Sequence, residues 1–290
     1  METLKILITG ASGFIGSNIM EYLEGKENNV FGCVRTQEKK KNERYIICDL
    51  EKEVLDIDVD IIIHTAGIRS YGNTDFNAFF DGNIIATKNV LEYAKLHNVK
   101  RIIFLGSVES YGEANGVLRE DSPRNNLNDY GVTKYVAEQL IRNSGIPYYI
   151  LILPGVVGRS CGGNWIINVA KALYSNKCVT YYNGQGLFNN ILDVQDLCAF
   201  IEKLITENVN KSETYLLGSS EKVTVENVVR FLKDKFLSAS QLYSDNQKRN
   251  AFYLDVNKAI SDGFSPHPII DTLDVVYKEV LRRENQADKY

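Results

Sequence analysis

Residues 9–16, Thr-Gly-Ala-Ser-Gly-Phe-Ile-Gly, decide the fold of this chain. An apolar run over residues 4–9 predicts a buried strand directly before them, and the apolar spacing of residues 15–23 predicts a helix directly after them. Small residues at such a junction let the backbone turn tightly and approach a pyrophosphate, which the helix N-terminus then binds through its unpaired N–H groups. The order strand, glycine turn, helix therefore predicts a dinucleotide-binding fold.

Alternating strands and helices continue through the first two-thirds of the chain. Residues 30–34, 61–65, 102–106 and 148–154 are apolar runs typical of buried parallel strands, and residues 76–96 and 130–143 are long enough for crossover helices. Residues 194–205 predict one more helix. We therefore predict an α/β fold, a doubly wound parallel sheet with a small C-terminal substrate lobe. Residues 1–160 plus 184–210 form the sheet domain in this interpretation, and residues 161–183 plus 211–290 form the lobe.

The composition excludes several functional classes. Of the 290 residues, 44% are hydrophobic and 24% are charged, and the formal net charge of -4 argues against partners such as nucleic acid or anionic lipid. Five scattered cysteines and only three histidines favour reduced thiols and no metal centre. The first residues carry no signal-peptide pattern and no apolar run is long enough to span a bilayer, so we expect a cytoplasmic protein without a membrane anchor.

A second motif predicts proton chemistry. Tyr130 and Lys134 are four residues apart and share one helix face. Because the pKa of a free tyrosine, about 10, is too high for a base at neutral pH, a neighbouring ammonium that lowers it would suit proton transfer. Ser107 follows the strand 102–106, at the sheet edge where ligands gather, and Ser110 is a rival in the same loop.

These motifs together resemble the extended short-chain dehydrogenases/reductases, the NAD(P)-dependent epimerase/dehydratase family that modifies nucleotide sugars. The resemblance continues to about residue 265 and thins after Pro154. It implies a Rossmann fold and hydride transfer between a nicotinamide and a carbinol or carbonyl carbon. In that reaction Tyr130 passes the proton, Ser107 rather than Ser110 orients the oxygen, and Lys134 tunes Tyr130 and holds the nicotinamide ribose. The resemblance also implies a homodimer through helix 76–96 and the helix from residue 130.

The resemblance assigns further residues to the two binding sites. The implied cofactor-binding residues are Gly10, Ser12, Gly13, Phe14, Ile15, Gly16, Arg35, Asp49, Leu50, Thr65, Ala66, Gly67, Tyr130, Lys134 and Pro154. The implied substrate-binding residues are Asn83, Ser107, Tyr111, Asn164, Asn189 and Arg249. Asn189 stands where the family arginine grips the substrate diphosphate, and Arg249 is a possible substitute for that arginine. Alternatively, Tyr111 only packs, Asn164 only forms a turn, and Arg249 is a solvated loop residue.

The end of the second strand bears on cofactor choice. NAD enzymes usually place a carboxylate there to hold the ribose hydroxyls, whereas this chain has Val34 followed by Arg35. An arginine fork suits a 2′-phosphate. We therefore predict NADP, with NAD as the alternative if Arg35 is an ordinary surface residue.

Three reactions are common in the family: epimerisation, 4,6-dehydration and ketone reduction. Dehydratases carry Thr-Asp-Glu where this chain has Ser107-Val108-Glu109, and valine cannot protonate a leaving hydroxyl. The NADP preference favours an NADPH-dependent reductase of a nucleotide-linked 4-keto-6-deoxysugar. The alternatives are an NAD(P)-dependent nucleotide-sugar 4-epimerase and a reductase of phenolics or aldehydes. A third is a non-catalytic dinucleotide-binding sensor or scaffold, against which the joint presence of serine, tyrosine and lysine argues.

Overall fold

The structure is a computed structural model that describes residues 4–26, 29–53, 55–69, 75–207, 210–245 and 251–287. The chain folds into two compact units. The first comprises Met1–Gly112, Pro123–Ile152 and Cys198–Tyr215, and the second comprises Glu113–Ser122, Leu153–Leu197 and Leu216–Tyr290. Residues 153–160 and 184–197, which the sequence assigned to the sheet domain, thus group with the second unit. The reason is that β8 (Gly155–Val157) pairs with β11 (Ile191–Asp193) in a small sheet of their own.

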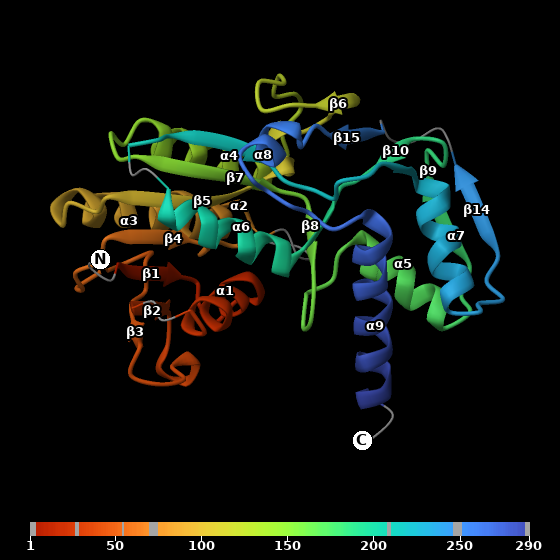
Figure 1. Ribbon diagram of the computed structural model, residues 1–290, viewed down its shortest axis with the longest axis horizontal. Coiled ribbons are helices and arrows are strands. Elements are labelled where there is room, and N and C mark those ends of the chain that lie inside the picture. The colour runs from red at the N-terminus through yellow and green to blue at the C-terminus, as the bar shows by residue number, and fades with distance from the viewer. Residues whose placement is uncertain are drawn as a thin grey trace. The chain divides into compact units, whose positions relative to one another are not determined.

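The predicted doubly wound sheet forms the centre of the first unit (Figure 1). Its seven strands follow the order β12-β7-β5-β4-β1-β2-β3. Their bounds are β1 Lys5–Thr9, β2 Asn29–Val34, β3 Tyr45–Ile47, β4 Ile61–His64, β5 Arg101–Ser107, β7 Tyr148–Leu153 and β12 Glu213–Leu216. Strand β1 pairs in parallel with both β2 and β4, so the strand order reverses direction at β1. In open α/β sheets such a reversal point is where ligands bind.

Helices cover both faces of this sheet. They are α1 (Phe14–Glu24), α2 (Phe76–Phe79), α3 (Ala86–Leu96), α4 (Asp129–Arg142) and α6 (Val194–Thr206). Helices α3 and α4 pack against each other, whereas Tyr22 of α1 donates a hydrogen bond to Glu202 of α6 at 3.1 Å. A π-helical turn, Phe80–Ile85, joins α2 to α3, so the predicted helix 76–96 is continuous but locally widened. Such turns are frequent at functional sites.

The strands were predictable because both sheet faces are covered. All seven residues of β5 are buried, as are all four of β4, which explains their unbroken apolar runs. Buried Arg101 is the exception in β5. Its guanidinium donates to the carbonyl of Leu204 at 2.6 Å and lies 4.8 Å from the ring centre of Tyr149. Two strands of the sheet, β3 and β12, were not predicted because each has only three or four residues in polar surroundings.

The described residues of the second unit form short strand pairs and the helices α5 (Trp165–Tyr174), α7 (Val225–Lys235), α8 (Asn257–Ser261) and α9 (Ile269–Ala287). Besides β8 and β11, the strand pairs are β9 (Val179–Tyr182) with β14 (Leu242–Asp245), β10 (Leu187–Phe188) with β13 (Val223–Thr224), and β6 (Gly116–Leu118) with β15 (Phe252–Leu254). Helices α5, α7 and α9 pack on one another, and the ring centres of Phe236 and Tyr277 are 4.8 Å apart.

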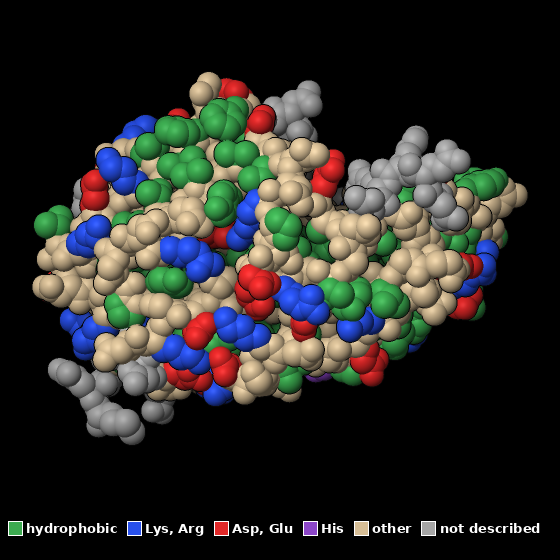
Figure 2. All heavy atoms as spheres, turned by 90° about the horizontal axis from the view of Figure 1, so that it is seen from above, with side chains coloured by type: hydrophobic (Ala, Val, Ile, Leu, Met, Phe, Trp, Pro, Cys, Tyr) green, Lys and Arg blue, Asp and Glu red, His purple; other side chains and the backbone are tan. Residues whose placement is uncertain are grey.

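On the face drawn in Figure 2, Lys and Arg side chains alternate with Asp and Glu, and no large area of one charge appears there. Within the described residues, no helix is long and apolar enough to cross a membrane, and no group of three or more His, Cys, Asp and Glu side chains is arranged to hold a metal ion.

Candidate active site

The glycine loop connects β1 to α1 in a conformation that requires glycine at two positions. Gly10 has a φ of 66°, and a Cβ there would lie 2.9 Å from the backbone nitrogen of Ala66. A Cβ on Gly16 would overlap the carbonyl oxygen of Gly10. The Gly13 N–H donates to that same carbonyl at 2.9 Å, and Gly13 begins α1 without a side-chain cap. The loop thus leaves backbone N–H groups at the helix start open to an anion.

A cavity of about 250 Å³ lies along this loop, within the first unit. It is lined by Gly10, Ser12, Gly13, Cys33, Val34, Arg35, Cys48, Leu50, Thr65, Ala66, Gly67, Gly82 and Ala86. Eight of the lining residues were in the cofactor set expected from the sequence. The other seven residues of that set do not line the cavity: Phe14, Ile15, Gly16, Asp49, Tyr130, Lys134 and Pro154. A site with open backbone N–H groups at a helix N-terminus and an apolar wall suits a dinucleotide.

A buried histidine fixes the strand ends that border the cavity. The imidazole of His64 contacts the hydroxyl of Thr9 at 2.7 Å and the hydroxyl of Thr87 at 3.0 Å. The Thr9 hydroxyl in turn accepts the N–H groups of Thr65 and Ala66, at 3.2 and 3.1 Å. Burial lowers the pKa of His64 to about 3, so its ring is neutral at physiological pH. The resemblance implied that Thr65, Ala66 and Gly67 at this strand end bind the cofactor, but it did not predict that His64 holds the strand end in place.

Ser107 and Tyr130 come together as the sequence pattern predicts. Ser107 ends β5 and Tyr130 lies in the first turn of α4, and their hydroxyls hydrogen-bond each other. The Ser107 hydroxyl also accepts the N–H of Glu109 at 3.2 Å. Tyr130 packs against Phe79, with ring centres 5.7 Å apart. Burial raises the pKa of Tyr130 above its ordinary value, and the hydrogen bond with Ser107 only partly offsets this.

Lys134 does not act on Tyr130 in the way that the sequence suggested. Its ammonium donates to the carbonyl of Leu105 at 2.7 Å and lies 4.4 Å from the ring centre of Phe104. Burial lowers the pKa of Lys134 to about 8. The pKa of Tyr130 is therefore raised rather than lowered as expected, because burial of the phenol outweighs the lowering effects of Ser107 and Arg69.

The Asn83 side chain connects Ile68, which directly follows the cavity-lining Gly67, to helix α4. Its side-chain oxygen accepts the N–H of Ile68 at 2.9 Å, and its amide donates to the Ile68 carbonyl and to the Thr133 hydroxyl, both at 3.0 Å. The side chain is buried in the π-helical turn. These bonds connect the Asn83 side chain to residue 68 and to α4, and its expected substrate role stays a prediction.

Sequence reasoning missed an ion pair beneath the catalytic loop. The Arg124 guanidinium donates to Glu138 at 3.0 Å and to the Ser110 hydroxyl at 2.6 Å. Its carbon lies 3.5 Å from the ring centre of Tyr111. Tyr111 is fully buried, which favours the packing alternative for it over a contact with a sugar. Nothing in the spacing of these residues signals the pair, because it depends on the fold of residues 113–128.

Arg35 is held by carboxylates. Its guanidinium forms an ion pair with Glu51 and lies 3.7 Å from the carboxylate of Asp49. Asp49 also accepts a bond from Lys52 at 3.0 Å. The arginine lines the cavity, but its charge is already compensated. The sequence argument for a 2′-phosphate assumed that this charge was available.

The remaining expected site residues belong to the second unit. Asn164 caps α5, accepting the N–H of Ile167 at 3.0 Å, which is the turn alternative. Asn189 is fully buried and exchanges hydrogen bonds with the backbone of Leu254, at 2.8 and 2.9 Å. These bonds tie its side chain to the backbone of this unit, and its expected substrate role stays a prediction. Pro154 is buried directly after β7. Arg249 lies outside the described residues.

Comparison with known proteins agrees with this geometry. The model of the NAD dependent epimerase/dehydratase family matches residues 6–218. A putative UDP-glucose 4-epimerase of Methanocaldococcus jannaschii is 28% identical, covering 90% of this chain and 93% of that protein. The uncharacterized UDP-glucose epimerase YtcB of Bacillus subtilis is also 28% identical, covering 80% and 82%. Among solved structures, UDP-glucuronic acid 4-epimerase of Bacillus cereus in complex with NAD has a TM-score of 0.81 at 24% identity, covering 96% of this chain and 99% of that one.

The family model matches well over half of the 290 residues. The matched part contains the fold described above together with Ser107, Tyr130 and Lys134. The chain belongs to the NAD-dependent epimerase/dehydratase family and is an enzyme of the extended short-chain dehydrogenase/reductase type.

Proposed function

We propose that this enzyme is an NAD-dependent 4-epimerase of a nucleotide-linked sugar. The observation that carries the proposal is the pairing of Arg35 with Glu51 and Asp49. The reductase prediction rested on an arginine free to bind the 2′-phosphate of NADPH, and that support is gone. Relatives described as UDP-glucose 4-epimerases, and similar structures crystallised with NAD and UDP-glucose or UDP-glucuronic acid, support the epimerase.

The residues of the glycine loop and cavity fit NAD. The open N–H groups at the start of α1 would hold the pyrophosphate, and Val34 and Leu50 would flank the adenosine. When bound, the nicotinamide supplies reversible two-electron oxidation of a carbinol carbon. The protein supplies position and proton transfer. The carboxylates around Arg35 favour a ribose with free hydroxyls over one carrying a phosphate dianion.

Proton transfer falls to Tyr130 and Ser107. The Ser107 hydroxyl lies beside the phenol and would hold the substrate oxygen there, while Tyr130 takes and returns its proton. Lys134 is already fixed by the Leu105 carbonyl and would order the ribose and tyrosine around its ammonium. An epimerase needs this one acid–base group for both half-reactions, because the second is the reverse of the first on the other face of the sugar.

The loop after Ser107 offers no second acid for dehydration. Val108 carries no ionisable group, and the Glu109 carboxylate accepts a hydrogen bond from Asn128 at 2.9 Å, which ties it to the start of α4. Elimination of water would need an acid that protonates the leaving hydroxyl. These contacts support epimerisation over 4,6-dehydration.

The test is an interconversion assay on the purified enzyme. UDP-glucose, UDP-galactose, UDP-glucuronic acid and UDP-galacturonic acid are each incubated with enzyme and NAD, and the anomeric proton signals are followed by NMR. We expect at least one pair to reach the same equilibrium mixture from either side, without net formation of NADH. Tyr130→Phe is the matched control and should abolish the interconversion. If no pair interconverts while NADPH is consumed with a 4-keto-6-deoxysugar nucleotide, the enzyme is a reductase and the proposal is wrong.

A further inference from the structure

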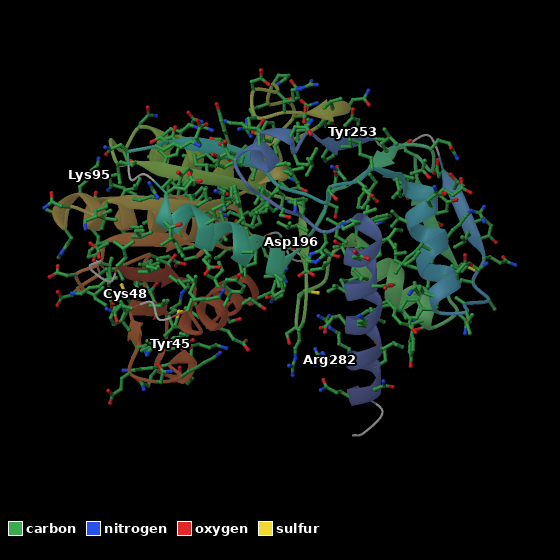
Figure 3. All side chains as sticks on the ribbon, viewed as in Figure 1. Tyr45, Cys48, Lys95, Asp196, Tyr253 and Arg282 are labelled. Carbon is green, nitrogen blue, oxygen red and sulfur yellow. The ribbon has the colours of Figure 1, made fainter. Side chains whose placement is uncertain are left out.

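Two cysteines lie side by side in the wall of the dinucleotide cavity. Cys33 belongs to β2, and Cys48 follows β3 directly. Strands β2 and β3 run parallel with Val34 opposite Ile47, and the Cys48 N–H donates to the Val34 carbonyl at 2.9 Å. This register turns both side chains toward the same cavity. Figure 3 shows Cys48 near Tyr45, at the β3 side of the sheet.

The Cys33 thiol lies against the backbone of Cys48. Its sulfur is 3.7 Å from the Cys48 carbonyl oxygen, and the Cys48 thiol donates to the Glu53 carbonyl at 3.8 Å. The Cys33 thiol lowers the pKa of Cys48, and the Cys48 thiol raises the pKa of Cys33. The pair is therefore asymmetric, with Cys48 the better nucleophile and Cys33 the thiol beside it. A low-pKa cysteine next to a second cysteine is the arrangement found in thiols that oxidise reversibly.

The cavity gives small molecules a route to this pair. Both sulfur-bearing residues have little surface exposure, 1% for Cys33 and 6% for Cys48, but both line the cavity that begins at the glycine loop. The other cysteines are placed differently. Cys178 is exposed in the second unit, and Cys161 and Cys198 are buried and do not line this cavity. A dinucleotide in the cavity would therefore cover the wall through which a small oxidant reaches this pair.

We propose that Cys33 and Cys48 form an oxidation site for hydrogen peroxide, and that their disulfide prevents the binding of the dinucleotide. The Cys48 thiolate attacks one peroxide oxygen, the O–O bond breaks, and the departing hydroxide takes a proton to become water. Cys48 is then a sulfenic acid. The Cys33 sulfur attacks the Cys48 sulfur, the S–O bond breaks, and the hydroxyl leaves with the Cys33 proton as a second water. The two sulfurs lose two electrons, and one peroxide is reduced to two waters.

Disulfide formation changes the shape of the cavity wall. The two sulfurs must leave their carbonyl partners and approach each other to a bond of about 2.05 Å. Because Val34 and Arg35 follow Cys33, and Leu50 lies two residues beyond Cys48, the wall that would flank the adenosine moves with them. The proposal depends on the dinucleotide cavity and not on the sugar substrate.

The test uses the full chain freed of dinucleotide. Hydrogen peroxide is added, disulfides are mapped by peptide mass spectrometry, and NAD binding is measured by calorimetry before treatment, after treatment and after dithiothreitol. We expect a peptide bridged between Cys33 and Cys48, a Kd for NAD raised at least about tenfold, and recovery with dithiothreitol. Saturating NAD added first should slow formation of the bridge.

Two variants separate the pair from the other thiols. Cys33→Ser should give no bridge but a sulfenic acid at Cys48, which dimedone traps. Cys178→Ser, which removes the exposed thiol of the second unit, should behave as the unaltered enzyme. Absence of the bridge in the NAD-free enzyme overturns the proposal, as does a bridge that leaves the Kd for NAD unchanged. Because neither measurement uses a sugar, failure of the epimerase assay does not affect this result.

Discussion

Replacing Glu51 by glutamine should shift the dinucleotide preference toward NADP. Glu51 pairs with the Arg35 guanidinium, and Asp49 lies 3.7 Å from the Nε atom of the same side chain. A 2′-phosphate bound by Arg35 would therefore stand beside two carboxylates. The substitution removes one negative charge and keeps the size and the hydrogen-bonding oxygen of the side chain.

The magnitude follows from the charges. Two unit charges 4 Å apart interact by about 1 kcal/mol in water, and a phosphate carries close to two charges at neutral pH. Repulsion from Glu51 thus costs NADP about 2 kcal/mol before screening. The Arg35 side chain is 56% exposed, so salt reduces this repulsion, to about 1 kcal/mol. The Kd ratio of NADP to NAD should then fall about fivefold in Glu51→Gln.

Calorimetric titration of NAD and NADP into the dinucleotide-free enzyme measures this ratio. Glu53→Gln is the matched control, because Glu53 is a nearby carboxylate that bonds the Asp49 N–H at 3.4 Å rather than Arg35. We expect the unaltered enzyme to prefer NAD and the control to change the ratio less than about twofold. A preference of the unaltered enzyme for NADP would refute the reasoning, as would an unchanged ratio in Glu51→Gln.

Three further predictions concern the catalytic pair, the glycine loop and the buried histidine. Tyr130→Phe should lower kcat by about 10² to 10⁴ with little change in Tm; a variant with full activity would remove Tyr130 from the mechanism. Gly16→Ala places a Cβ on the Gly10 carbonyl, so calorimetry should detect no NAD binding while circular dichroism shows a folded chain. The pKa of His64 is about 3 in the native state and 6.5 in its ordinary state. Between pH 6.5 and pH 3 the unfolded chain therefore binds a proton at His64 that the native chain does not bind. The free energy of unfolding should therefore fall by about 1.4 kcal/mol per pH unit as pH drops below 6.5. Denaturant unfolding of His64→Asn should lack this slope, and an equal slope would assign it to other groups.

The sheet and the positions of Ser107, Tyr130 and Lys134 on it were predictable because short-range patterns encode them. A fully buried strand such as β5 has an apolar run, and the glycine loop has a sterically fixed spacing. Ser107 and Tyr130 could be paired because Ser107 ends strand β5 and Tyr130 lies at the start of α4, the helix that follows this strand. The raised pKa of Tyr130 could not be predicted in this way, since burial of a side chain cannot be read from its neighbours in sequence.

The role of Arg35 could not be predicted, because it depends on a partner 16 residues away. Strand β3 is too short to be recognised, yet it places Glu51 beside the end of β2. Asn189 illustrates the same limit. It stands at a position typical of a substrate-binding arginine, but the fold buries it against the backbone of Leu254. The contact between Cys33 and Cys48 likewise arises only when β2 and β3 pair.

The central claim is that a cofactor held by the enzyme transiently oxidises C4 of the sugar. The most direct test uses UDP-glucose that carries deuterium at C4, or the sugar nucleotide that interconverts if UDP-glucose is not accepted. The labelled sugar is incubated with the enzyme and NAD in ordinary water, and C4 of the product is examined by NMR and mass spectrometry. The account predicts UDP-galactose that retains the deuterium, because the electrons and the C4 hydrogen return from the bound cofactor. Product that has exchanged its C4 deuterium for solvent hydrogen would contradict the account, as would an enzyme that converts no nucleotide sugar at C4.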